Sequence, residues 1–278
     1  MTTGTSHSAW VNKKLFQHKA CKKENEPYTM TAIKYRTKQQ YGQQESTSPP
    51  LDKTGKKFIQ PVCEKILFLG RAVDSTLLCP ISAIAAQSAK PTKDTMKYTM
   101  QFLDHVATQE EAILTFNSSN MQLAVHSDES FLRKPKARSR AGGHFFLSND
   151  STILPNNGAI LNIAHIIRHV MPSATKVKLA ALYIMAREAV YICIILEEMG
   201  HEKPPTPLQT DASMAEAVTN GKVQPKHTQS MNMQLHWLCD RECKKQFQIY
   251  WRPGKLNYAD YWTKHHSGPH HHNMRIFF

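Results

Sequence analysis

The stretch Met121-Gln-Leu-Ala-Val-His-Ser-Asp128 alternates apolar and polar residues and then stops at an aspartate. This period of two residues is typical of a β-strand. A second apolar run, Pro207-Leu-Gln-Thr-Asp211, also ends at an aspartate, and a third aspartate, Asp260, opens a helix-like segment. In an open α/β sheet, ligands bind beyond the carboxyl ends of the strands. We therefore expect Asp128, Asp211 and Asp260 to gather there as oxygen ligands for Mg²⁺ or Mn²⁺.

The rest of the second half of the chain alternates between strand and helix patterns. The expected strands cover residues 122–127, 141–148, 159–167, 208–210 and 247–252, and the expected helices cover residues 175–199, 213–218, 229–245 and 257–264. Three strands joined by hairpins come first, and helices then cross between strands. Crossover helices imply some parallel pairing. The pattern predicts an α/β fold with a mixed five-stranded sheet flanked by helices, preceded by a small helical connection segment.

Composition divides the chain into four parts. Residues 1–56 are polar and basic without a sustained period, and we expect this N-terminal segment to be mostly disordered. Residues 57–117 carry apolar faces at helical spacing and form the expected connection segment. Residues 118–266 form the expected α/β domain. Residues 267–278 are a His-rich tail, which we interpret as flexible.

The protein is strongly basic, with a formal net charge of +13 among 278 residues. This charge indicates a polyanionic partner, and nucleic acid is the first expectation. Residues 1–20 lack the apolar core of a signal peptide, so the six cysteines are expected to be reduced thiols. The longest apolar run is too short to span a bilayer. We expect an intracellular protein, cytoplasmic or nuclear, without a membrane partner.

Seven short motifs follow one another in an order that matches a known family. They are His126-Ser-Asp-Glu-Ser130, Arg138-Ser-Arg-Ala-Gly-Gly-His-Phe-Phe-Leu147, Ser173-Ala-Thr-Lys-Val-Lys-Leu179, Leu196-Glu-Glu-Met-Gly200, Thr206-Pro-Leu-Gln-Thr-Asp211, Leu235-His-Trp237 and Ala259-Asp-Tyr-Trp-Thr-Lys264. With these motifs the chain resembles copia-type LTR retrotransposon polyproteins, in the reverse transcriptase connection and the ribonuclease H region. Upstream, Ala72-Val-Asp74 and Pro91-Thr-Lys93 fit the connection segment of that family.

The resemblance implies a ribonuclease H-like fold and a nuclease that cuts the RNA strand of an RNA–DNA hybrid. Three of the family's catalytic, metal-holding carboxylates fall on Asp128, Asp211 and Asp260. In such a site two Mg²⁺ ions activate a water molecule and stabilise the leaving oxygen. A polymerase palm is not part of the sequence, so the resemblance also implies a piece of a longer polyprotein.

One residue of the expected catalytic site has the opposite charge to its counterpart in the family. The family reads roughly Ser-Ser-Thr-Glu-Ala-Glu-Tyr where this chain has Ser-Ala-Thr-Lys176-Val-Lys178-Leu, and Lys178 replaces the remaining catalytic glutamate. The apolar residues on its helical stripe are Leu182, Met185, Ala189, Ile192 and Leu196. The ammonium is therefore expected to face the sheet, to compete with a metal ion and to pair with Asp128 or Asp211. The alternative is a shifted helix with Lys178 extended into solvent.

Two further departures concern Ala212, where the family usually has Asn, and Asn232, where it has an acidic residue. The first hypothesis is thus a degenerate retroelement ribonuclease H domain with impaired catalysis. The alternatives are a non-catalytic nucleic-acid-binding module and a decayed retrotransposon remnant. Glu129 lies beside Asp128, but neighbours on a strand face opposite sides, so we do not expect it to supply the missing carboxylate.

A basic run joins the first two expected strands. Its cationic residues are Arg133, Lys134, Lys136, Arg138 and Arg140. They are expected to contact nucleic-acid phosphates, and the alternative is a solvated hairpin tip.

The remaining motifs are interpreted as structural. His236, Cys239 and Cys243 share a helix face, but without a matching CxxC motif we expect them to pack rather than to bind metal. Trp237, Trp251 and Trp262 could stack on bases, but we expect Trp251 in the core. His126 is expected to be a hydrogen-bonded core histidine.

Overall fold

The computed structural model describes residues 2–5, 18, 22–29, 46–109, 112–149, 157–221, 232–275 and 277–278. The chain forms two compact units. The described residues up to Phe116 and from Lys264 onward belong to the first unit, and Asn117–Thr263 form the second. Each unit has a hydrophobic cluster of its own.

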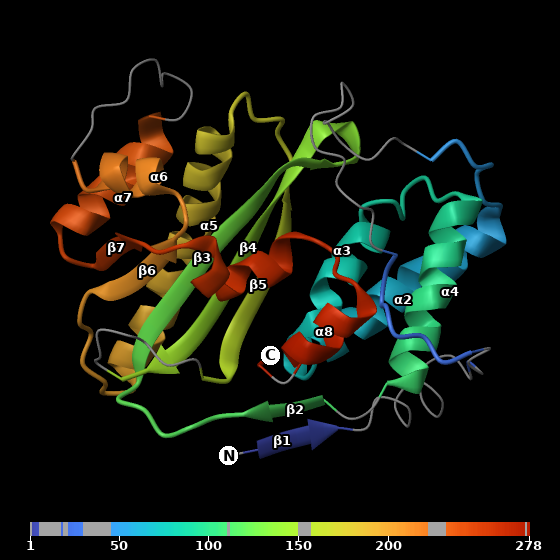
Figure 1. Ribbon diagram of the computed structural model, residues 1–278, viewed down its shortest axis with the longest axis horizontal. Helices are drawn as coiled ribbons and strands as arrows, with labels where there is room; N and C mark the ends of the chain where they lie inside the picture. Colours follow the sequence, from blue (N-terminus) through green and yellow to red (C-terminus); the bar gives the residue numbers. More distant parts are fainter. Residues whose placement is uncertain are drawn as a thin grey trace. The chain divides into compact units, whose positions relative to one another are not determined.

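The second unit contains a five-stranded sheet (Figure 1). Its strands are β3 (Gln122–Lys134), β4 (Arg138–Ser148), β5 (Ala159–Ile167), β6 (Thr206–Thr210) and β7 (Phe247–Trp251). They lie in the order β5-β4-β3-β6-β7. The pairs β3–β4 and β4–β5 are antiparallel, and the pairs β3–β6 and β6–β7 are parallel. The predicted mixed α/β sheet of five strands is confirmed, and β5 has the predicted bounds.

The β3–β4 hairpin is longer than the sequence pattern predicts. Strand β3 continues through Asp128 to Lys134, and a single 3₁₀ turn, η3 (Pro135–Ala137), then connects it to β4. Lys136 and Ala137 close this turn with left-handed φ values of 63° and 52°. The sequence does not predict this part of β3, because the residues after Asp128 do not alternate between apolar and polar. Their pairing with β4 stabilises the strand instead.

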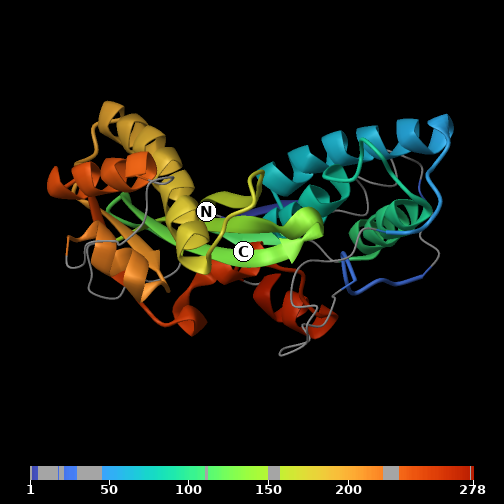
Figure 2. The same ribbon diagram turned by 90° about the horizontal axis from the view of Figure 1, so that it is seen from above.

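One face of the sheet is covered by α5 (Ala174–Glu198), with α6 (Ser213–Thr219) and α7 (Asn232–Cys243) beside it (Figure 2). Ser173 caps α5 by accepting a hydrogen bond from the Lys176 amide. Leu182, Met185 and Ala189 are fully buried against the sheet, and burial of a side chain as large as Leu or Met contributes roughly 1.5–3 kcal/mol. By length and composition alone α5 could also span a membrane, but its buried face belongs to the core of this unit.

The opposite face of the sheet carries the 3₁₀ helix η6 (Tyr258–Thr263). Its Trp262 is fully buried. Gly142 on β4 allows this close approach, since a Cβ there would lie 2.6 Å from the Ala259 carbonyl oxygen. The helix expected over residues 257–264 is present as this 3₁₀ helix.

The first unit is built from helices and one short strand pair. Its elements are β1 (Thr2–Thr5), α2 (Lys53–Ala72), η2 (Ser75–Leu77), α3 (Leu78–Ala85), α4 (Lys93–Thr108), β2 (Ala112–Thr115) and α8 (Gly268–Arg275). Ile59, Ile66, Phe102 and Leu103 form the centre of its core, each at most 1% exposed. Helix α2 begins inside the interval predicted to be disordered, where Asp52 caps it by accepting from the Gly55 amide.

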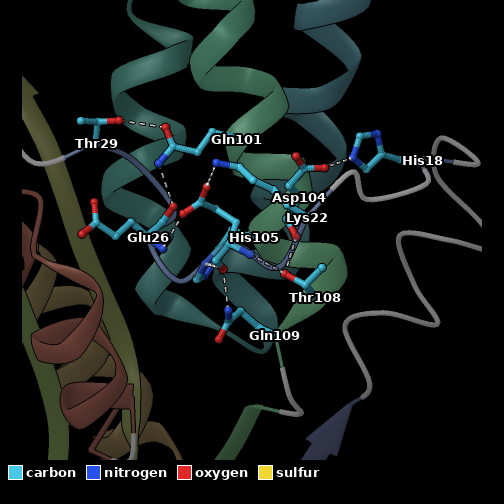
Figure 3. A network of polar contacts seen from close by, with 10 residues as sticks. His18, Lys22, Glu26, Thr29, Gln101, Asp104, His105, Thr108 and Gln109 are labelled. Atoms are coloured by element: carbon cyan, nitrogen blue, oxygen red, sulfur yellow. Dashed lines mark hydrogen bonds and ion pairs between the residues drawn. The ribbon is translucent and has the colours of Figure 1, made fainter.

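Residues 22–29 also depart from that prediction, because they are held against α4 by hydrogen bonds (Figure 3). The Glu24 carbonyl oxygen accepts from Gln109 Nε2 at 2.6 Å and lies 3.0 Å from His105 Nδ1. The Glu26 carbonyl oxygen accepts from Gln101 Nε2 at 3.1 Å. The expectation of disorder is therefore wrong for this stretch, and residues 6–17, 19–21 and 30–45 lie outside the described residues.

The His-rich end of the chain is not a flexible tail where the structure describes it. Residues 268–275 form α8, and His271 is buried at 2% exposure. Its ring lies 5.0 Å from that of His105, and Arg275 forms a buried ion pair with Asp74 at 3.2 Å. The polar composition of this stretch masked the helix, since its order comes from tertiary contacts and not from an apolar stripe.

Candidate active site

Three carboxylates meet where β3 and β6 run side by side. Ligand oxygens of Asp128, Glu129 and Asp211 all lie within 4.8 Å of one another. Asp128 and Glu129 belong to β3, and Asp211 follows the last residue of β6, whose Thr210 pairs with Ser127. The parallel pairing of Ser127 on β3 with Thr210 on β6 brings the residues that follow them, Asp128 and Asp211, together, as the sequence pattern predicts.

Glu129 is the member of this cluster that the sequence analysis did not expect. Its neighbour Asp128 faces η6, where Thr263 Oγ1 donates to Asp128 Oδ2 at 3.3 Å. Glu129 faces α5, as the alternation of a strand requires. The pairing of β6 with β3 ends at Ser127, so the edge of β3 is open beyond it and the carboxylates can approach each other around it. Glu129, which we did not expect to supply the missing carboxylate, thus lies in the carboxylate cluster.

Lys178 lies on α5 directly opposite these acids. Its Nζ donates to Asp211 Oδ1 at 3.0 Å and is 3.7 Å from Glu129 Oε1. The side chain is only 25% exposed, so the alternative in which it extends into solvent does not apply. The expected pairing with an aspartate occurs with Asp211.

The charges of this cluster perturb one another. Burial, followed by the charge of Asp128, raises the pKa of Glu129 to about 9, although the Lys178 ammonium acts in the opposite direction. For Lys178, burial lowers the pKa, but the opposing carboxylates of Glu129, Asp211 and Asp128 outweigh it and the pKa is raised. Crowding of the three acids favours a proton on Glu129, and the nearby carboxylates favour the charged form of Lys178.

Asp260 is placed differently from the expectation. It lies on η6, half-buried, and among the described residues the acidic cluster does not include it. Its backbone carbonyl accepts from Thr263 Oγ1 at 2.8 Å, and the same hydroxyl lies 3.3 Å from Asp128. Asp260 is thus connected to the site through Thr263, while Glu129 occupies the third place in the carboxylate group.

The cluster of three carboxylates is only partly suited to binding a divalent metal ion. Three carboxylates are the oxygen ligands that Mg²⁺ and Mn²⁺ prefer. However, the Lys178 ammonium already lies at hydrogen-bonding distance from Asp211, and a cation there would have to displace it. The arrangement therefore does not fit two metal ions as it stands.

The basic run at the β3–β4 turn is only partly at the surface. Arg140 is fully buried and Lys134 is 6% exposed, which corrects the expectation that both contact phosphates. Their positions on the strands direct these two side chains inward. Lys136 is exposed, and Arg133 and Arg138 are half-buried.

Two aromatic side chains near the site differ in their surroundings. His126 is buried, and its Nδ1 accepts from the Tyr258 amide at 3.2 Å. Burial, then the charges of His144 and Arg252, hold the pKa of His126 well below its usual value, consistent with a neutral core histidine. Trp251, expected in the core, is instead 47% exposed, and its Nε1 donates to the Asp211 carbonyl oxygen at 3.0 Å.

The other sequence candidates do not form a metal cluster within the described part of the chain. His236 and Cys243 are exposed on α7, and Cys239 is half-buried. The described cysteines are Cys63, Cys79, Cys193, Cys239 and Cys243, and all are free thiols. Ala212 is buried at 5% exposure, and the side chain of Asn232 lies outside the described residues.

A signal for Glu129 was present in the sequence. The chain has a lysine where the family has a glutamate, and an acid directly after Asp128. A lysine in place of an acid attracts nearby carboxylates, and Lys178 Nζ lies 3.7 Å from Glu129 Oε1.

Three antiparallel strands followed by two parallel ones make this an RNase H-like α/β sheet. No protein-family model and no curated protein matches the sequence. Similar solved structures include the N-terminal RNase H domain of rv2228c from Mycobacterium tuberculosis, with 15% identity, a TM-score of 0.37, and 51% of this chain and 91% of that chain covered.

RNase H1 from the halophilic archaeon Halobacterium salinarum is 12% identical with a TM-score of 0.32, and the match covers 56% of this chain and 97% of that chain. The foamy viral protease-reverse transcriptase, solved in complex with dsDNA, is 12% identical with a TM-score of 0.40. That match covers 73% of this chain and 41% of the viral one. Sequence identity is 15% or less in these three matches.

Proposed function

We propose that this chain is a ribonuclease H-like domain of retroelement origin whose cleavage of RNA in RNA–DNA hybrids is impaired by Lys178. The observation that carries the proposal is the contact of Lys178 Nζ with Asp211 Oδ1 at 3.0 Å. A catalytic glutamate at this position would leave the site acidic and open to metal ions. A lysine there supplies the positive charge from the protein itself.

The ancestral chemistry depends on divalent metal. Two Mg²⁺ or Mn²⁺ ions held by carboxylates would activate a water molecule and stabilise the leaving oxygen. In this chain Asp128 and Asp211 would hold a remaining ion, with Asp260 approaching from η6. Glu129 would have to lose a proton before it could take part, because its pKa is raised to about 9.

The copia-type assignment is part of this proposal and rests on the seven ordered motifs. It implies that the chain derives from a longer polyprotein and acts in the cytoplasm or nucleus. The formal net charge of +13 supports a polyanionic partner.

A second candidate function is favoured by the surface of the hairpin turn. Lys136 is exposed, and Arg133 and Arg138 are half-buried beside it. Such residues grip phosphates without chemistry. A non-catalytic module that binds RNA–DNA hybrids would therefore keep this turn while its carboxylate cluster loses activity. A decayed retrotransposon remnant would keep neither the binding of hybrids nor their cleavage.

The test is an assay of the natural protein and Asp128→Asn on a labelled RNA–DNA hybrid, in Mg²⁺ and in Mn²⁺, with hybrid binding measured at several salt concentrations. The proposal predicts salt-dependent binding with little or no cleavage by either protein. Rapid cleavage by the natural protein that Asp128→Asn abolishes would refute the impairment. Failure to bind the hybrid at physiological salt would favour the remnant.

A further inference from the structure

Trp251 is the last residue of β7, the edge strand of the sheet. Its side chain is 47% exposed, although tryptophan is usually among the more deeply buried residues. The indole Nε1 donates to the Asp211 carbonyl oxygen at 3.0 Å. This hydrogen bond fixes the ring against the backbone of a site residue and leaves the apolar surface of the ring partly open to solvent.

Strand alternation places this ring on the face of the sheet that carries Lys178. Phe247 and Ile249, four and two residues earlier on β7, are buried in the core cluster beneath α5, at 2% and 3% exposure. Trp251 continues this face beyond the end of the core. The following turn, η5 (Gly254–Leu256), also borders the site, since a Cβ on Gly254 would lie 3.3 Å from Asp211 Oδ2.

The turn after Trp251 is basic. Arg252 follows Trp251 but points to the opposite side of the strand, with 5.6 Å between its guanidinium carbon and the Tyr250 ring centroid. Lys255 on η5 is exposed. A fixed, partly open aromatic ring with cationic neighbours is the combination that binds single-stranded nucleic acid, because the ring stacks on a base and the cations neutralise phosphates.

We propose that Trp251 is a stacking platform for an unpaired base of a nucleic-acid strand that passes the carboxylate site. The inference rests on the proposed function and adds the contact that holds the strand beside Asp211. Stacking tolerates any base, since every base has an aromatic face. The contact therefore provides affinity and position without sequence preference.

The experiment uses the full chain and two fluorescently labelled probes, a blunt RNA–DNA hybrid and a single-stranded RNA. Affinities are measured by fluorescence polarisation for the natural protein, Trp251→Phe and Trp251→Ala. Tyr191→Ala is the matched control, because Tyr191 is an aromatic residue with 58% exposure and lies about 20 Å farther along α5 than Lys178 at 1.5 Å per residue. Circular dichroism verifies that each variant is folded.

We expect Trp251→Ala to bind single-stranded RNA about ten-fold more weakly than the natural protein, while Trp251→Phe and Tyr191→Ala stay within about three-fold. Equal affinities for the natural protein and Trp251→Ala would overturn the inference and leave the proposed function intact. Equal losses in Trp251→Phe and Trp251→Ala would also overturn it, by assigning the effect to the hydrogen bond with Asp211.

Two outcomes concern the proposed function itself. Binding of the single strand that depends on Trp251, without binding of the hybrid, would refute the hybrid as partner and support the stacking platform. Absence of binding to both probes would overturn both proposals, and the exposed ring would then be a contact for another protein.

Discussion

Lys178 and Asp211, which come from the first turns of α5 and from the end of β6, form a hydrogen-bonded ion pair at 3.0 Å. The pair lies within a cluster of three carboxylates that would otherwise attract a metal ion. Since both side chains are about one quarter exposed, water screens the pair only in part, and the pair is more than an incidental surface contact. The protein thus carries a built-in cation where a divalent ion would bind.

Removal of that cation should strengthen metal binding. We expect Lys178→Met to bind Mn²⁺ at least about ten-fold more tightly than the natural protein, because the ammonium no longer competes for Asp211. Isothermal titration calorimetry measures the difference. Lys176→Met, which removes the same charge two residues earlier, serves as control, and an equal gain in that variant would assign the effect to general charge.

Gly142 and Gly143 are predicted to differ in their tolerance of alanine. Gly142 pairs with Asp128, and a Cβ there would lie 2.6 Å from the fixed backbone oxygen of Ala259. A Cβ on Gly143 would lie 2.0 Å from the sulfur of Met185, a flexible side chain that can shift, and 3.0 Å from the Phe145 ring. Gly142→Ala should therefore lower the free energy of unfolding by about 1–3 kcal/mol, and more than Gly143→Ala. Urea denaturation tests the order, and the reverse order would show that η6 is easier to displace than Met185.

Acid should destabilise the first unit through two buried histidines. Burial, followed by the charge of His271, lowers the pKa of His105 to about 3, and burial lowers that of His271 to about 4. Asp74 raises both pKa values and Arg275 lowers both. Because each folded pKa lies below the unfolded value of about 6.5, the unfolded chain binds more protons than the folded chain as the pH falls. The contribution of the two neutral histidines to the free energy of unfolding is therefore fully present above about pH 6.5. It is lost as the pH falls toward about 4.

Thermal unfolding at a series of pH values measures this decline. His271→Asn should flatten the dependence between about pH 6.5 and pH 4, because one of the two coupled groups is gone. His270→Asn, on the same helix but exposed, should leave it unchanged. A slope that His271→Asn does not alter would show that other groups cause the acid sensitivity.

The sheet could be predicted from the sequence because its apolar residues repeat with the periods of strand and helix. Residues 159–167 illustrate this, since the predicted and observed bounds of β5 agree. The order of residues 22–29 could not be predicted, because Tyr28 is buried through stacking on Tyr98 at 4.6 Å and the surrounding hydrogen bonds reach to α4. Contacts between residues far apart in the chain leave no local pattern.

The candidate site was predicted in part for the same reason. Asp128 and Asp211 end apolar runs that pair in parallel, so their proximity follows from the fold. Glu129 was not predicted, because strand alternation gives only the face toward which a side chain points. The alternation does not show that a side chain can extend around the edge of β3, which is open beyond Ser127. Trp251 was misplaced because its apolar character predicts burial, whereas the hydrogen bond to Asp211 keeps it at the rim.

Cleavage of a labelled RNA–DNA hybrid in Mn²⁺ by Lys178→Glu tests most directly whether Lys178 impairs a metal-dependent nuclease site. We predict cleavage at least about ten-fold faster than that of the natural protein, with no gain in Lys176→Glu and loss of the gain when Asp128→Asn is added. A rise in the Tm of Lys178→Glu on addition of Mn²⁺ would verify that the variant is folded and binds metal. A folded, metal-binding Lys178→Glu that cleaves no faster than the natural protein would contradict the account.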